Sequence, residues 1–72
     1  MEFEIEFYEN NDKKKHNHRI MRVTENYEGY MWHTDIYYYD DNYETIIQAS
    51  KGFDAPAGVI EYLRELVNFP KE

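Results

Sequence analysis

The sequence predicts an α+β domain in which a four-stranded antiparallel β-meander is followed by one C-terminal α-helix packed on one face (β-β-β-β-α). Three observations predict it. Apolar and acidic residues alternate along residues 2–8, aromatic and β-branched residues form short runs between turn residues, and apolar residues recur at helical spacing near the C-terminus. With 72 residues, the chain is interpreted as one domain, residues 1–72. The order of the strands in the sheet is left open.

The first strand has the clearest pattern. Phe3, Ile5 and Phe7 alternate with glutamates, so one face of the strand is expected to be buried and the other solvated. Residues 9–18 contain no apolar side chain and are rich in Asn, Lys and His. Since Asn and Asp favour turns and tolerate positive φ, we expect an exposed, mobile loop there.

Three more strands follow, predicted over residues 19–25, 30–39 and 43–49, with turns at 26–29 and 40–42. The short connections predict antiparallel hairpins. Adjacent Ile20 and Met21 must face opposite sides of the sheet, and so must Ile46 and Ile47.

A connection over residues 50–53 leads into the predicted helix of about 13 residues, a common length in globular proteins. Its apolar stripe would pack on the sheet, and Gly58 would permit a close approach. The stripe contains Val59, Ile60, Leu63, Leu66 and Val67. The expected boundary signals are Asp54 as N-cap, Pro56 in the first turn, Asn68 as C-cap and Pro70 as stop.

One helix leaves the other face of the sheet uncovered. If Trp32, Ile36 and Tyr38 face the core, the outward side chains are those of Met31, His33, Asp35, Tyr37 and Tyr39. The reverse register would turn Tyr30 and Trp32 outward. Tyrosine tolerates both environments, so such a face can simply be solvated. Tyr, Trp and Met are also enriched at interfaces.

The first function hypothesis is therefore a small non-enzymatic protein-binding or dimerising module that uses its Tyr-rich sheet face or a sheet edge. A protein partner or self-association is expected. The candidate interaction residues are Met31, His33, Tyr37 and Tyr39, with Tyr30 and Trp32 if the register is reversed.

The charge is strongly segregated along a chain with a net charge of −7. Residues 13–22 carry five bases and no acid, whereas residues 1–12 and 23–50 carry acids and no Lys or Arg. The overall sign disfavours general binding to nucleic acids or anionic membranes, because phosphate binding depends on Lys and Arg.

Two alternative functions use this segregation. One is an acidic inhibitor that imitates nucleic acid and binds a basic, nucleic-acid-processing protein; a composition rich in Asn, Lys, Tyr and Ile is typical of low-GC genomes and phages. The other is a single-stranded nucleic-acid binder that uses Lys13–Lys15 with Arg19 and Arg22, although acids on the neighbouring strands oppose it. The carboxylates of the first alternative are Glu2, Glu4, Glu6, Glu28, Asp35, Asp40, Asp41 and Glu44.

Metal binding and catalysis have little support. His16 and His18, with His33 and Asp35, contain metal-ligating groups, but solvated surface histidines are the favoured interpretation. His33 and Asp35 would suit a base and its orienting partner, yet no nucleophile accompanies them, since there is no Cys and the single Ser is Ser50. We therefore expect no metal, no cofactor and no enzyme activity.

The absence of Cys excludes a disulfide scaffold and favours a cytoplasmic location. No apolar stretch approaches the ~20 residues of a membrane-spanning helix, and the first residues do not resemble a signal peptide. A membrane is therefore not expected among the partners.

Overall fold

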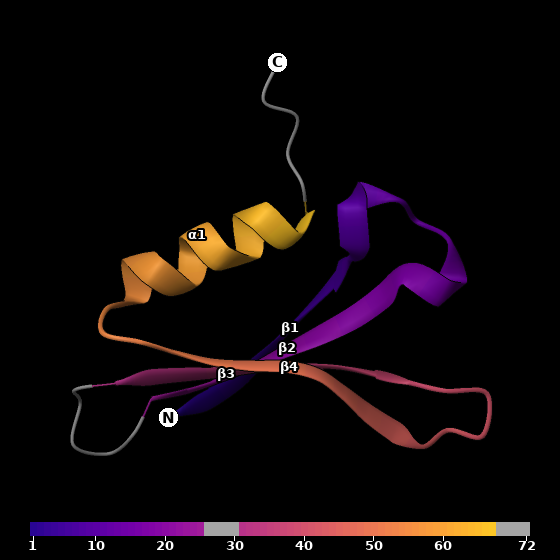
Figure 1. Ribbon diagram of the computed structural model, residues 1–72, viewed down its shortest axis with the longest axis horizontal. Helices are drawn as coiled ribbons and strands as arrows, with labels where there is room; N and C mark the ends of the chain where they lie inside the picture. The colour runs from indigo at the N-terminus through magenta and orange to yellow at the C-terminus, as the bar shows by residue number, and fades with distance from the viewer. Residues whose placement is uncertain (26–30, 68–72) are drawn as a thin grey trace.

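Four strands form one antiparallel sheet and a single helix lies across one side of it (Figure 1). The structure is a computed structural model and describes residues 1–25 and 31–67. The sheet order β1-β2-β3-β4 is that of a meander, so the predicted β-β-β-β-α fold is confirmed. The elements are β1 Glu2–Tyr8, β2 His18–Glu25, β3 Trp32–Tyr39, β4 Thr45–Phe53 and α1 Pro56–Val67, with short 3-10 turns at Glu9–Asn11 and Lys15–Asn17.

The core lies between the sheet and α1. It contains Phe7 of β1, Met21 and Val23 of β2, Ile36 of β3 and Val59 of α1. Strand pairing explains this selection, because Ile5 pairs with Met21 and Met21 pairs with Ile36, which places all three on the same face. Met21 is 0% exposed there, and Ile20 points to the opposite face, as the sequence required.

The register of β3 is the first of the two alternatives. Trp32 pairs with Phe53, and Ile36 pairs with Met21, so Trp32, Ile36 and Tyr38 face the helix side. Thr34 is buried on this side too, and its hydroxyl donates to the carbonyl of Lys51 at 3.0 Å. The uncovered face therefore carries His33, Asp35, Tyr37 and Tyr39.

The last strand is longer than predicted. Residues 50–53 were expected to form a connection, but they continue β4 to Phe53. The reason is tertiary: Phe53 pairs with Trp32 and its ring packs against Tyr62 of α1 at a centroid distance of 5.3 Å, which overrides the turn preference of Gly52. A β-bulge between Ile36 and Tyr37 leaves Gln48 as the extra residue of β4.

Other boundaries also differ. The helix begins at Pro56, two residues after Asp54, and within the described residues the Asp54 side chain makes no hydrogen bond. The predicted turn at 26–29, the Asn68 cap and the Pro70 stop lie outside the described residues, as does Tyr30. No helix in the described ranges is both long and apolar enough to cross a membrane.

Gly58 gives the close approach between α1 and the sheet that the sequence suggested. A Cβ at this position would lie 2.8 Å from Cδ1 and 3.4 Å from Cγ of Phe53. Gly58→Ala should therefore fail to give the ~1 kcal/mol that Ala normally adds in a helix. We expect a net loss of about 1 kcal/mol from overpacking, measured by urea unfolding.

A double-mutant cycle supplies the control for this prediction. In a Phe53→Ala background the clash with the ring is gone, so Gly58→Ala should become stabilising. Stabilisation by Gly58→Ala in the wild-type background would contradict the packing described here.

Candidate functional site

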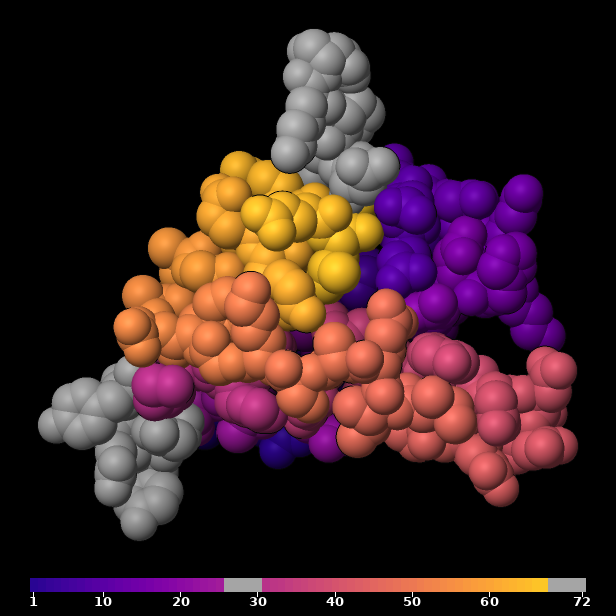
Figure 2. All heavy atoms as spheres, in the orientation of Figure 1, coloured from indigo at the N-terminus to yellow at the C-terminus, as the bar shows by residue number. Residues whose placement is uncertain are grey.

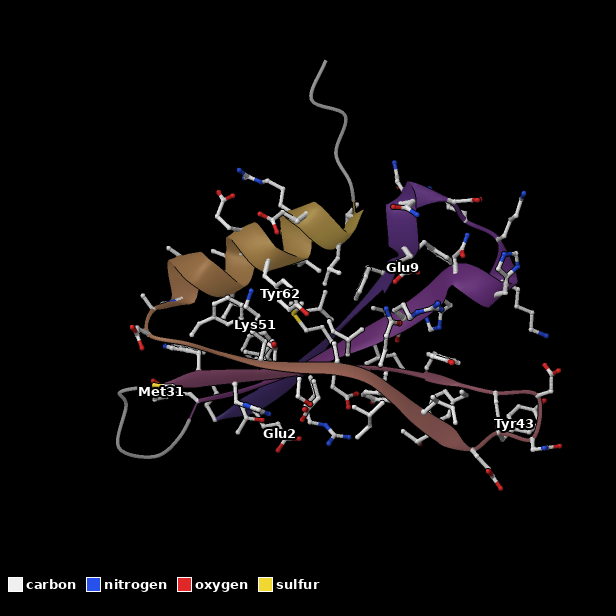
Figure 3. All side chains as sticks on the ribbon, viewed as in Figure 1. Glu2, Glu9, Met31, Tyr43, Lys51 and Tyr62 are labelled. Atoms are coloured by element: carbon white, nitrogen blue, oxygen red, sulfur yellow. The ribbon has the colours of Figure 1, made fainter. Side chains whose placement is uncertain are left out.

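The sheet face opposite the helix is a network of paired polar groups. Tyr37 donates its hydroxyl hydrogen to Oε2 of Glu4 at 2.7 Å, and the guanidinium of Arg22 lies 5.2 Å from the centre of the Tyr37 ring. Arg22 Nε is also 3.4 Å from a carboxylate oxygen of Glu2, which extends below the sheet in Figure 3. Tyr37 is only 4% exposed, so it stabilises this face and is not available as a free platform.

Two pKa shifts follow from this network. The hydrogen bond to Glu4, together with burial, raises the pKa of Tyr37 to about 12. The hydroxyl of Ser50 donates to Oδ1 of Asp35 at 2.5 Å and, with His33 at 3.2 Å, lowers the pKa of that carboxyl.

Stability should depend on pH through Tyr37. Its ordinary pKa is 10, so between pH 10 and about 12 the native state keeps a proton that the unfolded state releases. The stabilisation is complete below pH 10 and is lost as the pH rises to about 12. Urea unfolding on both sides of this window should show the fall.

Tyr37→Phe is the control for that pH dependence. It removes the titrating group and should make the fall in stability over this pH range smaller, while Tyr62, whose pKa is raised by burial, still contributes. An unchanged slope in Tyr37→Phe would refute the assignment.

The other predicted interaction residues are dispersed. His33 is exposed on the outer face and lies 3.2 Å from Asp35. Met31 is exposed just before β3, while Trp32 is partly buried on the helix side. Tyr39 is 52% exposed and its ring meets that of Tyr37 edge-on, at a centroid distance of 5.8 Å. Of the predicted set, Tyr39 alone among the described residues reaches the hollow discussed next.

A groove of about 980 Å³ opens between the loop that follows β1 and the β3–β4 hairpin. In Figure 2 it separates the purple loop atoms from the red hairpin atoms. One set of lining residues is aromatic and the other is basic, with Asp40 and Asp41 on the hairpin side. The aromatic set is Tyr8, Tyr38, Tyr39 and Tyr43; the basic set is Lys13, Lys15, His16, His18 and Arg19.

Arg19 holds the loop wall of the groove in place. Its Nη1 donates to the carbonyl oxygens of His16 at 2.8 Å and His18 at 3.0 Å, and its Nε donates to Gln48 of β4 at 2.7 Å. Its Nη2 lies 3.3 Å from Glu9, and its guanidinium covers the ring of Tyr38 at 4.5 Å. Arg19 thus ties the loop to the sheet, together with the hydrogen bond from Nε2 of Gln48 to Oε2 of Glu9 at 2.8 Å. Asn10 and Asn11 adopt the positive φ that the sequence suggested for this segment.

The remaining cations of the loop wall differ from Arg19. Lys13, Lys15 and His16 are exposed, and in the described part of the chain neither lysine forms an ion pair. The side chain of His18 already has partners within the chain, since its Nε2 lies 3.0 Å from Oε1 of Glu6 and its ring contacts the ring of Tyr8 edge-on. The lysines are the cations left available to a ligand.

The hairpin wall ends in a strained turn. Oδ1 of Asp40 accepts hydrogen bonds from the backbone N–H groups of Asn42 at 2.8 Å and Glu44 at 2.9 Å, which fixes the turn. Tyr43 sits in this turn with φ 61°, a conformation that favours Gly or Asn. It is 87% exposed and lies at the end of the hairpin (Figure 3).

The basic loop and Tyr39 were both recognised from the sequence, but not as parts of one site. Tyr8, Tyr38 and Tyr43 were not predicted as site residues. The available signal was positional, because Tyr8 ends β1 and Tyr38 lies near the end of β3, and in a meander these two ends flank the start of β2.

Metal-ligating residues do not converge in the described ranges, where no group of three or more His, Cys, Asp or Glu side chains could hold a metal ion. Comparisons with protein-family models, with curated proteins and with solved structures returned no match.

Proposed function

We propose that this protein is a small non-enzymatic protein-binding module that docks its partner in the groove between the basic loop and the β3–β4 hairpin. The observation that carries the proposal is the convergence of four tyrosines and five basic side chains on one hollow of about 980 Å³. Tyr and Arg are the residue types that most often anchor protein interfaces, and a concave site lets a few of them become fully buried on binding.

The proposal retains part of the Tyr-rich face predicted from the sequence. Tyr39 belongs to that face and also lines the groove, and Ile47 on the adjacent strand is 61% exposed. The ring of Tyr37 contacts the ring of Tyr39 edge-on. A partner that enters the groove would extend onto this small apolar area.

Capture of partners from a lysate, compared between matched baits, tests the proposal. Tyr39→Ser combined with Tyr43→Asn should abolish capture of proteins that the wild type retains. Ile60→Ser, which changes an exposed apolar side chain of α1, should leave capture unchanged. Equal capture by all three baits would refute the groove as the docking site.

Self-association is a special case of this function, in which the partner is a second copy. Light scattering across a hundredfold range of concentration would detect it. A dimer that persists in the Tyr39→Ser/Tyr43→Asn variant would place the contact elsewhere, for example at a sheet edge.

The acidic inhibitor is a second candidate. It is favoured by the alignment of Glu2, Glu4 and Glu6 with Asp35 on the face away from the helix. Against it, several of these carboxylates have cationic or hydroxyl partners within the chain. Binding to a basic partner that falls steeply with ionic strength and is lost in Glu2→Gln would support it. A cytoplasmic location, which the cysteine-free composition favours, belongs to both proposals.

A further inference from the structure

We infer that the groove recognises an acidic peptide segment. Its carboxylates would lie against Lys13 and Lys15 of the loop wall, and its apolar side chains would lie against the tyrosines of the hairpin wall, Tyr38, Tyr39 and Tyr43. This inference rests on the proposed function and names the chemistry of the partner. It is carried by the charge of the two walls and by the conformation of Tyr43.

The loop wall of the groove is basic, in contrast to the acidic chain as a whole. The chain has a net charge of −7, yet the loop wall presents exposed Lys13 and Lys15 without carboxylate partners in the described ranges. An acidic segment would be repelled by the glutamates of β1 and attracted to this wall. Such complementarity guides encounter and fixes orientation.

The opposite wall selects a peptide over a nucleic acid. Asp40 and Asp41 lie on the hairpin side together with Tyr38, Tyr39 and Tyr43. A polyanion with phosphates directed to both sides would meet these carboxylates. An extended peptide places successive side chains on opposite sides, so it can direct carboxylates to the loop and apolar groups to the tyrosines.

Tyr43 provides the second observation. A non-glycine residue in the left-handed region costs roughly 1–2 kcal/mol, and Tyr43 is almost fully exposed, so it contributes little to the core. Backbone strain of this kind is concentrated at functional sites. Tyr43 lines the groove and its ring is exposed, so the ring is available to pack against a bound segment.

Fluorescence anisotropy with three labelled probes of equal length tests the inference. The first is a peptide that alternates Glu and Leu, the second has Gln in place of each Glu, and the third is an oligothymidylate. We expect the Glu peptide to bind, the Gln peptide to bind about tenfold more weakly, and the affinity for the Glu peptide to fall with added salt.

Three single substitutions with the same change in charge locate the contact. Lys13→Gln and Lys15→Gln should each weaken binding of the Glu peptide by about threefold. Lys14→Gln is the matched control, since Lys14 belongs to the same loop but does not line the groove. An equal effect of all three would indicate general charge attraction and would overturn the inference.

Tyr43→Asn should change stability and affinity in opposite directions, which substitution of a purely structural residue would not do. Asn tolerates the left-handed conformation, so the urea midpoint should rise while affinity for the Glu peptide falls by about fivefold or more. Equal binding of the Glu and Gln peptides would overturn the acidic specificity, and the proposed function would still stand if Tyr39→Ser/Tyr43→Asn abolished partner capture. Tighter binding of oligothymidylate than of the Glu peptide would overturn both the acidic specificity and the proposed function. So would the absence of binding of any probe at low salt, if the Tyr39→Ser/Tyr43→Asn variant also captured partners as well as the wild type.

Discussion

Met21→Ala should leave the domain largely unfolded at 25 °C. Met21 is 0% exposed and lies between its strand neighbours Ile5 and Ile36 in the cluster that Val59 of α1 covers. Truncation of a buried Met to Ala costs about 2–5 kcal/mol. A single core in a chain of this size rarely supplies more than about 3–5 kcal/mol, so the loss is comparable to the total. Far-ultraviolet circular dichroism against urea measures it.

Two controls accompany this variant. Met21→Leu nearly conserves volume and should cost less than about 1.5 kcal/mol. Ile47→Ala removes an apolar side chain that is exposed, so its effect should stay within about 0.5 kcal/mol. A wild-type midpoint in Met21→Ala would mean that the centre of the core has been placed wrongly.

Arg19→Ala should release the loop wall of the groove and destabilise the protein by about 2–3 kcal/mol, because hydrogen bonds to a charged group are lost and their acceptors are left unpaired. The side chain of Arg19 is only 13% exposed, which limits replacement of these bonds by water. Hydrogen exchange at the amide of Asn17 reports the release, since that N–H bonds to the carbonyl of Lys14 at 2.9 Å. The rate should rise there more than at the amide of Ile36.

Arg19→Lys separates charge from geometry. Lysine keeps the positive charge but lacks the planar fork that reaches two carbonyls and Gln48 together, so its loop should exchange almost as fast as that of Arg19→Ala. Affinity for the acidic peptide should fall in both variants. Unchanged exchange at Asn17 in Arg19→Ala would show that the loop is held by other contacts.

The sequence predicted the fold where a local pattern and the tertiary structure agree. In β1, glutamates alternate with Phe3, Ile5 and Phe7, and the strand forms as expected. Phe7 is buried and Ile5 is partly buried, but Phe3 is 42% exposed, so the predicted buried face is incomplete at the start of the strand. At the end of β4 the local pattern favoured a connection, because Gly52 is a weak strand residue. The pairing of Phe53 with Trp32 decided the matter, and this pairing depends on a register that no single segment contains.

The candidate site was predictable only in parts. The basic loop and the tyrosines of β3 were both visible in the sequence, and so was the tendency of Asn10 and Asn11 toward turn conformations. Their convergence depends on strand order. Arg19 was considered only within the nucleic-acid-binding alternative, and its role in holding the loop through the carbonyls of His16 and His18 was not predicted. The burial of Tyr37 on the outer face depends on side-chain packing by Arg22 and Glu4, which periodicity alone does not reveal.

The meander has a kinetic consequence. Each strand pairs with the next one along the chain, so each hairpin can form from segments that are neighbours in the sequence before the whole sheet is complete. The hydrogen bond from Gln48 to Glu9 is different, because it joins residues 39 positions apart and requires all four strands. The groove can therefore assemble only after the sheet is complete, and an incompletely folded chain would be unable to hold a partner there.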